Sequence, residues 1–139
     1  MSTTDGRTTL SDDVLVNARE VLTSYIVGEV RMLSDEDGLD CLVKLRDLGR
    51  IQTSIGRVGD PIAPSFGSRA LEPDQIAVLI EAARWEDWEG IQIAENNWSE
   101  DVAGVDEARR VACERAWSAQ RLLEALGADR DERALRDAT

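Results

Sequence analysis

The residues of this chain that could do chemistry are almost all carboxylates. The sequence holds 28 aspartates and glutamates against 16 lysines and arginines, and it contains no histidine. The absence of histidine excludes Ser-His and Cys-His nucleophilic pairs, imidazole general bases and nearly all catalytic zinc sites. Cys41 and Cys113 are far apart in the sequence and are expected to be small buried hydrophobes in a reducing compartment. An enzymatic reaction would therefore have to use carboxylates, arginines, Lys44, Tyr25 or a cysteine.

The spacing of the carboxylates does not complete a metal site. Glu86 and Glu89 form an E-x-x-E pair that resembles half of the motif of all-helical nucleotide pyrophosphohydrolases, but no E-x-x-D follows them. Residues 33–44 place acids and a glycine as a calcium loop does, yet Leu33 and Lys44 stand at its two essential ends. We therefore predict a non-enzymatic protein with no catalytic residues, no metal site and no cofactor.

The negative charge of the chain is concentrated in one region. The formal net charge is −12, and residues 72–107 hold 11 acids and one base, Arg84, a net of −10. The sequence has no cluster of lysines and arginines that could neutralise a phosphate backbone, so direct nucleic-acid binding is not expected. The same region contains three of the four tryptophans, Trp85, Trp88 and Trp98. This combination of acids and aromatic side chains makes the region a candidate docking surface.

The hydrophobic periodicity predicts an all-α protein. Serines, acids or a proline precede four amphipathic segments, which are expected to form a bundle of about four main helices near residues 11–33, 34–56, 73–96 and 99–126. A loop with all three prolines, residues 56–73, separates the second helix from the third. No strand pattern of any length is present. An alanine stripe at positions 108, 112, 116 and 119 favours close approach of another helix to the fourth.

The chain has the length of one domain with its own core. Residues 1–10 are expected to be a mobile tail, residues 11–127 a single helical domain, and residues 128–139 a charged tail or short helix. The second helix carries apolar residues around most of its circumference, which predicts that it is the central and most buried helix. Neither a signal peptide nor a membrane span is recognised, so we expect a cytoplasmic protein, or a virion protein if the source is viral.

The phase of the third helix separates its tryptophans. At about 100° per residue, the core stripe continues to Asp87 and Trp98, whereas Trp85 and Trp88 face the opposite side. A straight helix would have two apolar faces and would hold Asp87 toward the core, whereas a break near Asp87 would turn both tryptophans inward. The second face could be covered within the molecule or by another chain. Trp117 lies off the core stripe of the fourth helix and could join the same layer.

Three functions stay open on the sequence. We expect an acidic helical protein that acts through protein–protein interaction, as a homo-oligomer or a subunit of a larger assembly such as a virion connector or a small adaptor. Its docking surface would consist of Trp85, Trp88, Glu81, Glu86 and Glu89, because arginine stacks on indole rings while carboxylates hold its charge. The alternatives are an inhibitor or regulator that occupies a basic groove of a partner, such as a nucleic-acid-binding groove, and a metal-dependent enzyme that uses carboxylates.

Overall fold

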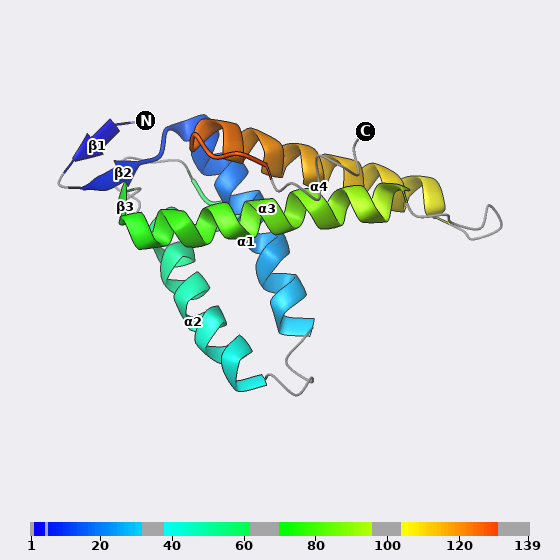
Figure 1. Cartoon of the computed structure of the whole chain (residues 1–139), viewed down its shortest axis with the longest axis horizontal. Helices are drawn as coiled ribbons and strands as arrows, with labels where there is room; N and C mark the ends of the chain where they lie inside the picture. The colour runs from blue at the N-terminus through cyan, green and yellow to red at the C-terminus, as the bar shows by residue number, and fades with distance from the viewer. Residues whose placement is uncertain (1, 5, 32–37, 62–69, 96–103, 131–139) are drawn as a thin grey trace.

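Four α-helices and three short strands form the described part of the chain in this computed structural model (Figure 1). The structure describes residues 2–4, 6–31, 38–61, 70–95 and 104–130. In chain order the elements are β1 (Ser2–Thr4), β2 (Arg7–Thr9), α1 (Asp12–Arg31), α2 (Gly38–Ile55), β3 (Ala70–Leu71), α3 (Pro73–Glu95) and α4 (Val105–Ala125). The expected all-α bundle of four main helices is confirmed.

The ends of the helices follow local signals in the sequence. Helix α3 begins at Pro73, whose fixed φ suits the first helical position, and Asp74 places a carboxylate in the first turn. Helix α4 is followed by Gly127 in the left-handed region, with φ 69°. The amide of Ala128 donates to the carbonyl of Leu123 at 2.9 Å, which closes the turn in the manner of a Schellman motif. Because these signals are local, the sequence predicts the start of α3 and the end of α4 accurately.

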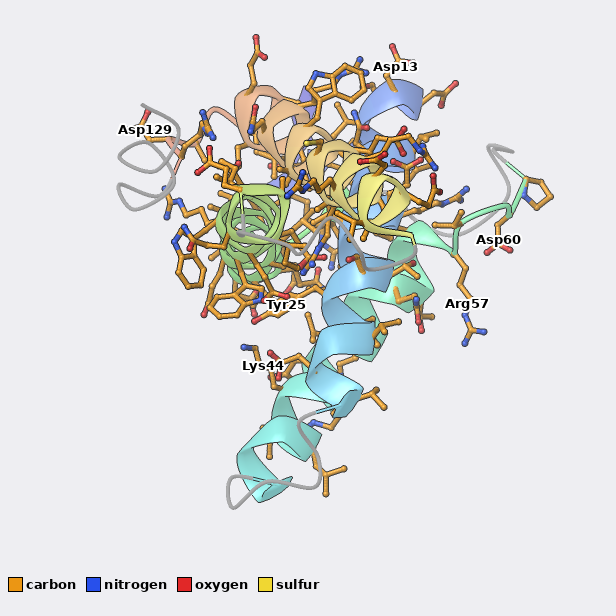
Figure 2. All side chains as sticks on the ribbon, turned by 90° about the vertical axis from the view of Figure 1, so that its right-hand side faces the viewer. Asp13, Tyr25, Lys44, Arg57, Asp60 and Asp129 are labelled. Carbon is orange, nitrogen blue, oxygen red and sulfur yellow. The ribbon has the colours of Figure 1, made fainter. Side chains whose placement is uncertain are left out.

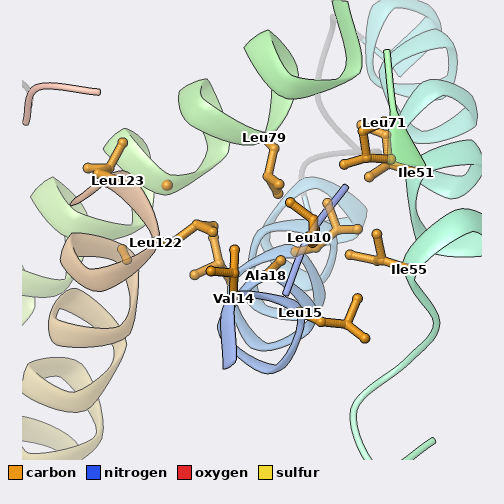
Figure 3. Close-up of a cluster of buried hydrophobic side chains, with 14 of the residues drawn as sticks. Leu10, Val14, Leu15, Ala18, Ile51, Ile55, Leu71, Leu79, Leu122 and Leu123 are labelled. Atoms are coloured by element: carbon orange, nitrogen blue, oxygen red, sulfur yellow. The ribbon is translucent and has the colours of Figure 1, made fainter. Parts of the chain in front are cut away.

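The body of the molecule is the antiparallel pair of α3 and α4, which α1 crosses (Figure 1). The hydrophobic core lies where these three helices meet the C-terminal half of α2 (Figure 3). The burial of the leucine and isoleucine side chains of this core supplies the main driving force for folding. The large apolar side chains that are at most 1% exposed are Leu10, Leu15, Leu22, Leu48, Ile51, Ile55, Leu71, Leu79, Leu122 and Leu123.

The C-terminal end of α1 and the N-terminal half of α2 project from the body as a two-helix arm, residues 26–31 and 38–47 (Figure 1, Figure 2). Helix α2 packs mainly against α1 and β3, so Leu42 and Val43 are 56% and 46% exposed. The prediction that the second helix is central and most buried is therefore wrong. The rest of the described chain covers the apolar residues of α2 on one side of the helix only.

A polar cluster lies at the base of the arm. Lys44 Nζ donates to Glu29 Oε1 at 3.2 Å and lies 4.8 Å from the centroid of the Tyr25 ring. Burial raises the pKa of the Tyr25 phenol, although Lys44 acts in the opposite direction. Burial alone would lower the pKa of Lys44, but its contacts with Tyr25 and Glu29 outweigh burial and raise it. The lysine therefore stays charged over the neutral range.

A small antiparallel sheet occupies part of the predicted N-terminal tail. Strand β2 pairs with β1 and also with β3, where Thr8 lies opposite Leu71 and Thr9 opposite Ala70. Leu10, directly after β2, is 1% exposed and joins the core. The strands contradict the expectation that residues 1–10 form a tail and that the chain has no strands. Short polar strands of this kind carry no hydrophobic alternation that would predict them.

A buried arginine holds the beginning of the loop after α2. Arg19 of α1 is 4% exposed, and its guanidinium donates to the carbonyl of Ile55 at 2.6 Å and to that of Asp60 at 3.0 Å. Gly56 and Gly59 adopt φ of 82° and 90°, which lets the chain turn at these positions. Residues 62–69 of the predicted loop lie outside the described residues.

The expectation that both cysteines are buried is wrong for Cys113. Cys113 is a free thiol on the exposed side of α4. The side chain of Cys41 lies outside what the structure describes.

Candidate functional site

Helix α3 runs without a break from Pro73 to Glu95, straight through the acid-rich tryptophan segment. Asp87 is 0% exposed, whereas Trp85 is 39% exposed. The sequence leaves open a straight helix or a helix with a break near Asp87. The structure shows the straight helix. Its inner side carries a carboxylate, and its outer side carries indole rings.

Trp85 and Trp88 contact each other on the outer side of α3. Their ring centroids lie 5.2 Å apart and their planes are tilted by 54°, a geometry typical of favourable aromatic pairs. Trp88 is partly buried, and neither ring belongs to the core cluster. The two rings form one continuous aromatic surface, which we call the tryptophan platform.

Exposed carboxylates border the platform along the helix. Asp74, Glu81 and Glu95 are all exposed. At about 100° per residue, they fall on the same side of α3 as the tryptophans. The single base of α3, Arg84, is already engaged, because its Nε donates to the carbonyl of Asp129 at 2.9 Å. The platform is therefore an apolar surface with negative charge on both sides.

Glu86, which the sequence assigned to the docking surface, lies inside the molecule. Its side chain is 1% exposed and forms an ion pair with Arg115 of α4. Arg115 also donates to Glu89 at 3.1 Å, and the Glu89 side chain is 33% exposed. Burial alone would lower the pKa of Arg115, but the two carboxylates outweigh burial and raise it. The surface therefore retains Trp85, Trp88 and Glu81, with Glu89 at its edge.

A second buried carboxylate binds the segment that follows α4. Asp87 accepts hydrogen bonds from Arg130 at 2.8 and 3.0 Å, one to each carboxylate oxygen, and from Gln120 at 2.8 Å. This bidentate contact fixes the beginning of the predicted C-terminal tail against α3. The sequence indicates that Asp87 faces the core and that arginines follow α4, but it does not indicate that the two meet. Residues 131–139 lie outside the described residues.

The two helices approach most closely at Gly90. A Cβ atom at this position would lie 2.8 Å from the carbonyl oxygen of Ala112 and 2.9 Å from the Cβ of Ala116. The alanine stripe of α4 therefore allows close approach, as the sequence predicts. This contact fixes α3 against α4, so the outer face of α3 presents the tryptophans on a rigid element.

Trp117, the other described tryptophan, does not extend the platform. Trp98 lies outside the described residues. Trp117 is 57% exposed on α4, and the guanidinium carbon of Arg121 lies 4.7 Å from its ring centroid. Trp117 therefore stacks with an arginine of its own helix and does not pair with another described tryptophan. It illustrates the arginine–indole contact that a bound partner could make with the platform.

A cleft between α2, β3 and the start of α3 has a volume of about 480 Å³. It is lined by charges of both signs, among them Arg7, Arg50, Asp47 and Glu72. Arg7 and Glu72 form an exposed ion pair at 3.3 Å. Among the described residues, no group of three or more potential ligands could hold a metal ion. The described part of the chain thus gives the metal-dependent alternative no specific site.

Comparison of this chain with protein-family models, curated proteins and solved structures gives no match. None of the helices in the described ranges is long and apolar enough to cross a membrane.

Proposed function

We propose that this chain is a non-enzymatic adaptor or assembly subunit, which binds an arginine-bearing apolar segment of a protein on the tryptophan platform. The observation that carries the proposal is the pair of indole rings on the outer face of an unbroken helix. Trp85 is 39% exposed, and its ring centroid lies 5.2 Å from that of Trp88. A large aromatic surface left in contact with water is a common property of binding sites.

The chemistry of the partner follows from the residues around the rings. Glu81 and Glu95 are exposed beside the platform and can hold a positive charge. A guanidinium can stack on an indole ring and bind a carboxylate at the same time, which an ammonium does less well. The preferred partner segment therefore carries arginine next to leucine or valine. Because the carboxylates are exposed, binding should weaken as the salt concentration rises.

The inhibitor alternative relies on free carboxylates, and several in the acidic region are already engaged. Glu86 and Glu89 bind Arg115, and Asp87 binds Arg130. The acidity of residues 72–107 is therefore partly neutralised within the molecule. An aromatic surface with an acidic border fits a partner with apolar and basic side chains better than it fits a purely basic groove.

A designed peptide tests the platform directly. The probe is a synthetic helix with leucine and arginine on one face, and the matched peptide has glutamate in place of arginine. We expect the arginine peptide alone to bind, and the double variant Trp85→Ala/Trp88→Ala to lose at least about tenfold in affinity, as measured by fluorescence anisotropy. Trp117→Ala, which removes an exposed tryptophan elsewhere, should bind as the unchanged chain does.

Two further results decide the test. Glu81→Arg keeps both tryptophans, and it should weaken binding of the arginine peptide. The proposal fails if the arginine peptide does not bind, or if Trp117→Ala weakens binding as much as the platform variant does. It also fails if circular dichroism shows that the platform variant has lost its helices, because the tryptophans would then serve the fold.

A further inference from the structure

The outer face of α2 is a second surface without a cover in the described chain. We define this face by Leu42, Val43, Arg46 and Arg50. Arg46 lies four residues after Leu42 and three after Val43, and Arg50 lies four residues after Arg46, which are helical spacings. Leu42 and Val43 are about half exposed, at 56% and 46%. The side chain of Arg46 is 62% exposed, and Arg50 is also exposed. The face therefore combines branched apolar side chains with guanidinium groups.

A helix that is apolar around most of its circumference is normally enclosed on all sides. In this chain the inner side of α2 contributes Leu48, Ile51 and Ile55 to the core. Its outer side carries the residues defined above, of which Arg50 also lines the cleft toward β3 and the start of α3. The apolar residues on the outer side therefore suit contact with another molecule.

The net charges of the helices indicate which molecule would bind the outer face of α2. Helix α2 contains two acids and three bases, a net of +1, and is the one helix of the four described with net positive charge. Helix α3 contains six acids and one base, a net of −5. The acids at positions 35 to 37 precede α2 and lie outside the described residues, so the proposed contact begins at Leu42. The outer face of α2 thus has the leucine, valine and arginine side chains that the platform is suited to bind.

We propose that the occupant of the tryptophan platform is a second copy of this chain, which docks the outer face of its α2 against Trp85 and Trp88. This inference rests on the proposed function. Arg46 and Arg50 of one copy would stack on the indole rings and pair with Glu81 of the other. The two surfaces differ, so the contact is head-to-tail, and each copy has both halves of it. When each copy repeats this head-to-tail contact with the next, the copies form either a closed ring or an open filament.

Sedimentation velocity over a range of protein concentrations tests the inference on the full chain. The unchanged chain should assemble, and assembly should weaken at high salt. The platform variant Trp85→Ala/Trp88→Ala and the α2 variant Leu42→Glu/Arg46→Glu should each sediment as monomers. An equimolar mixture of the two variants should form a 1:1 dimer, because one intact platform then meets one intact α2 face. Trp117→Ala and Val111→Glu, which alter exposed positions of α4, should assemble as the unchanged chain does.

Three results would overturn the inference. The chain could be monomeric at every concentration, the mixture could stay monomeric, or the platform variant alone could still assemble through pairing of two arms. If the designed arginine peptide binds the platform but the chain is monomeric, the proposed function stands and the second copy is rejected.

A charge exchange keeps the test valid if the α2 variant does not fold. Arg46→Glu alone should weaken assembly at least about tenfold, and combining it with Glu81→Arg in the same chain should restore most of the loss. A combined variant that assembles no better than Arg46→Glu alone would also overturn the inference.

Discussion

The α3–α4 pair and the arm differ in the side chains that they enclose. Helix α3 holds Glu86 and Asp87 at 0% exposure, one paired with Arg115 of α4 and the other with Arg130 just beyond it. The arm leaves Leu42 56% exposed. The pair thus buries charged groups while the arm exposes apolar ones, which reverses the usual distribution of these residues.

Burial in this chain depends on whether a residue meets a suitable neighbour. A carboxylate can be buried when a guanidinium supplies its hydrogen bonds and opposite charge. An apolar side chain is buried only when another element covers it, and Leu42 and Val43 stay about half exposed in the described chain. The arm thus exposes Leu42 and Val43 because no described neighbour covers them, whereas the pair can bury carboxylates because arginines reach them.

The largest predicted effect comes from removing the partner of a buried carboxylate. Arg115→Ala should lower the free energy of unfolding by about 3–5 kcal/mol, because it leaves Glu86 buried without a counter-charge. Urea unfolding followed by circular dichroism measures this loss. A negligible loss would show that the α3–α4 pair does not need Arg115 in order to bury Glu86, and would contradict the contrast drawn between the two regions.

The matched control removes both charges of the pair. Glu86→Leu/Arg115→Leu replaces the pair by apolar side chains of similar size and should recover most of the stability that Arg115→Ala loses. If the double variant is as unstable as the single one, lost packing of the arginine stem, and not an unpaired charge, explains the effect.

The second effect concerns how closely the two helices approach. Gly90→Ala should destabilise the chain by about 1–3 kcal/mol, because the new methyl group meets backbone and Cβ atoms of α4. Gly28 and Gly49, on α1 and α2, have open space around the same position. There the change to alanine should stabilise the helix by about 0.5–1 kcal/mol.

Thermal unfolding of the three glycine variants measures the contrast, with each variant compared with the unchanged chain. Opposite signs at Gly90 and at the two control positions are expected. A stabilising Gly90→Ala would mean that α3 and α4 lie farther apart than described, and the closely packed pair would no longer contrast with the open arm.

The helices could be predicted from the sequence because their signals are local. Pro73 marks the start of α3 and Gly127 follows the end of α4, and periodicity gives the inner faces of α1, α3 and α4. The sequence predicts that α4 starts near residue 99, but the helix begins at Val105, after Gly104 with φ 82°. The strands and the peripheral position of α2 could not be predicted, because both depend on which elements meet in space.

The candidate site could be predicted only in part for the same reason. Helical phase separated Trp85 and Trp88 from Asp87, and the unbroken α3 agrees with that separation. Glu86 is expected on the docking surface, but it is buried beside Asp87 on the inner side of α3. Its burial depends on Arg115, which is 29 residues away in the sequence. Such a long-range ion pair leaves no periodic signal.

Alkaline pH should affect the arm before the α3–α4 pair, and this is the smallest predicted effect. The pair joins carboxylates to guanidinium groups, whose protons are not lost in water. The arm relies on Lys44 and Tyr25, and both of their pKa values are raised in the folded chain. A folded state with raised pKa values binds more protons than the unfolded state above about pH 10. The free energy of unfolding therefore falls as the pH rises through this range, whereas near neutral pH neither group changes it.

Urea unfolding at a series of alkaline pH values measures this fall, and Tyr25→Phe separates the two groups. The variant lacks the titrating phenol, so its stability should fall less steeply than that of the unchanged chain. Phenolate absorbance reports the pKa directly, because the chain contains one tyrosine. Equal slopes for the two proteins, or an unshifted phenol, would show that the base of the arm is open to water. The arm would then lack even the small buried cluster that anchors it, and the contrast with the α3–α4 pair would be larger than described.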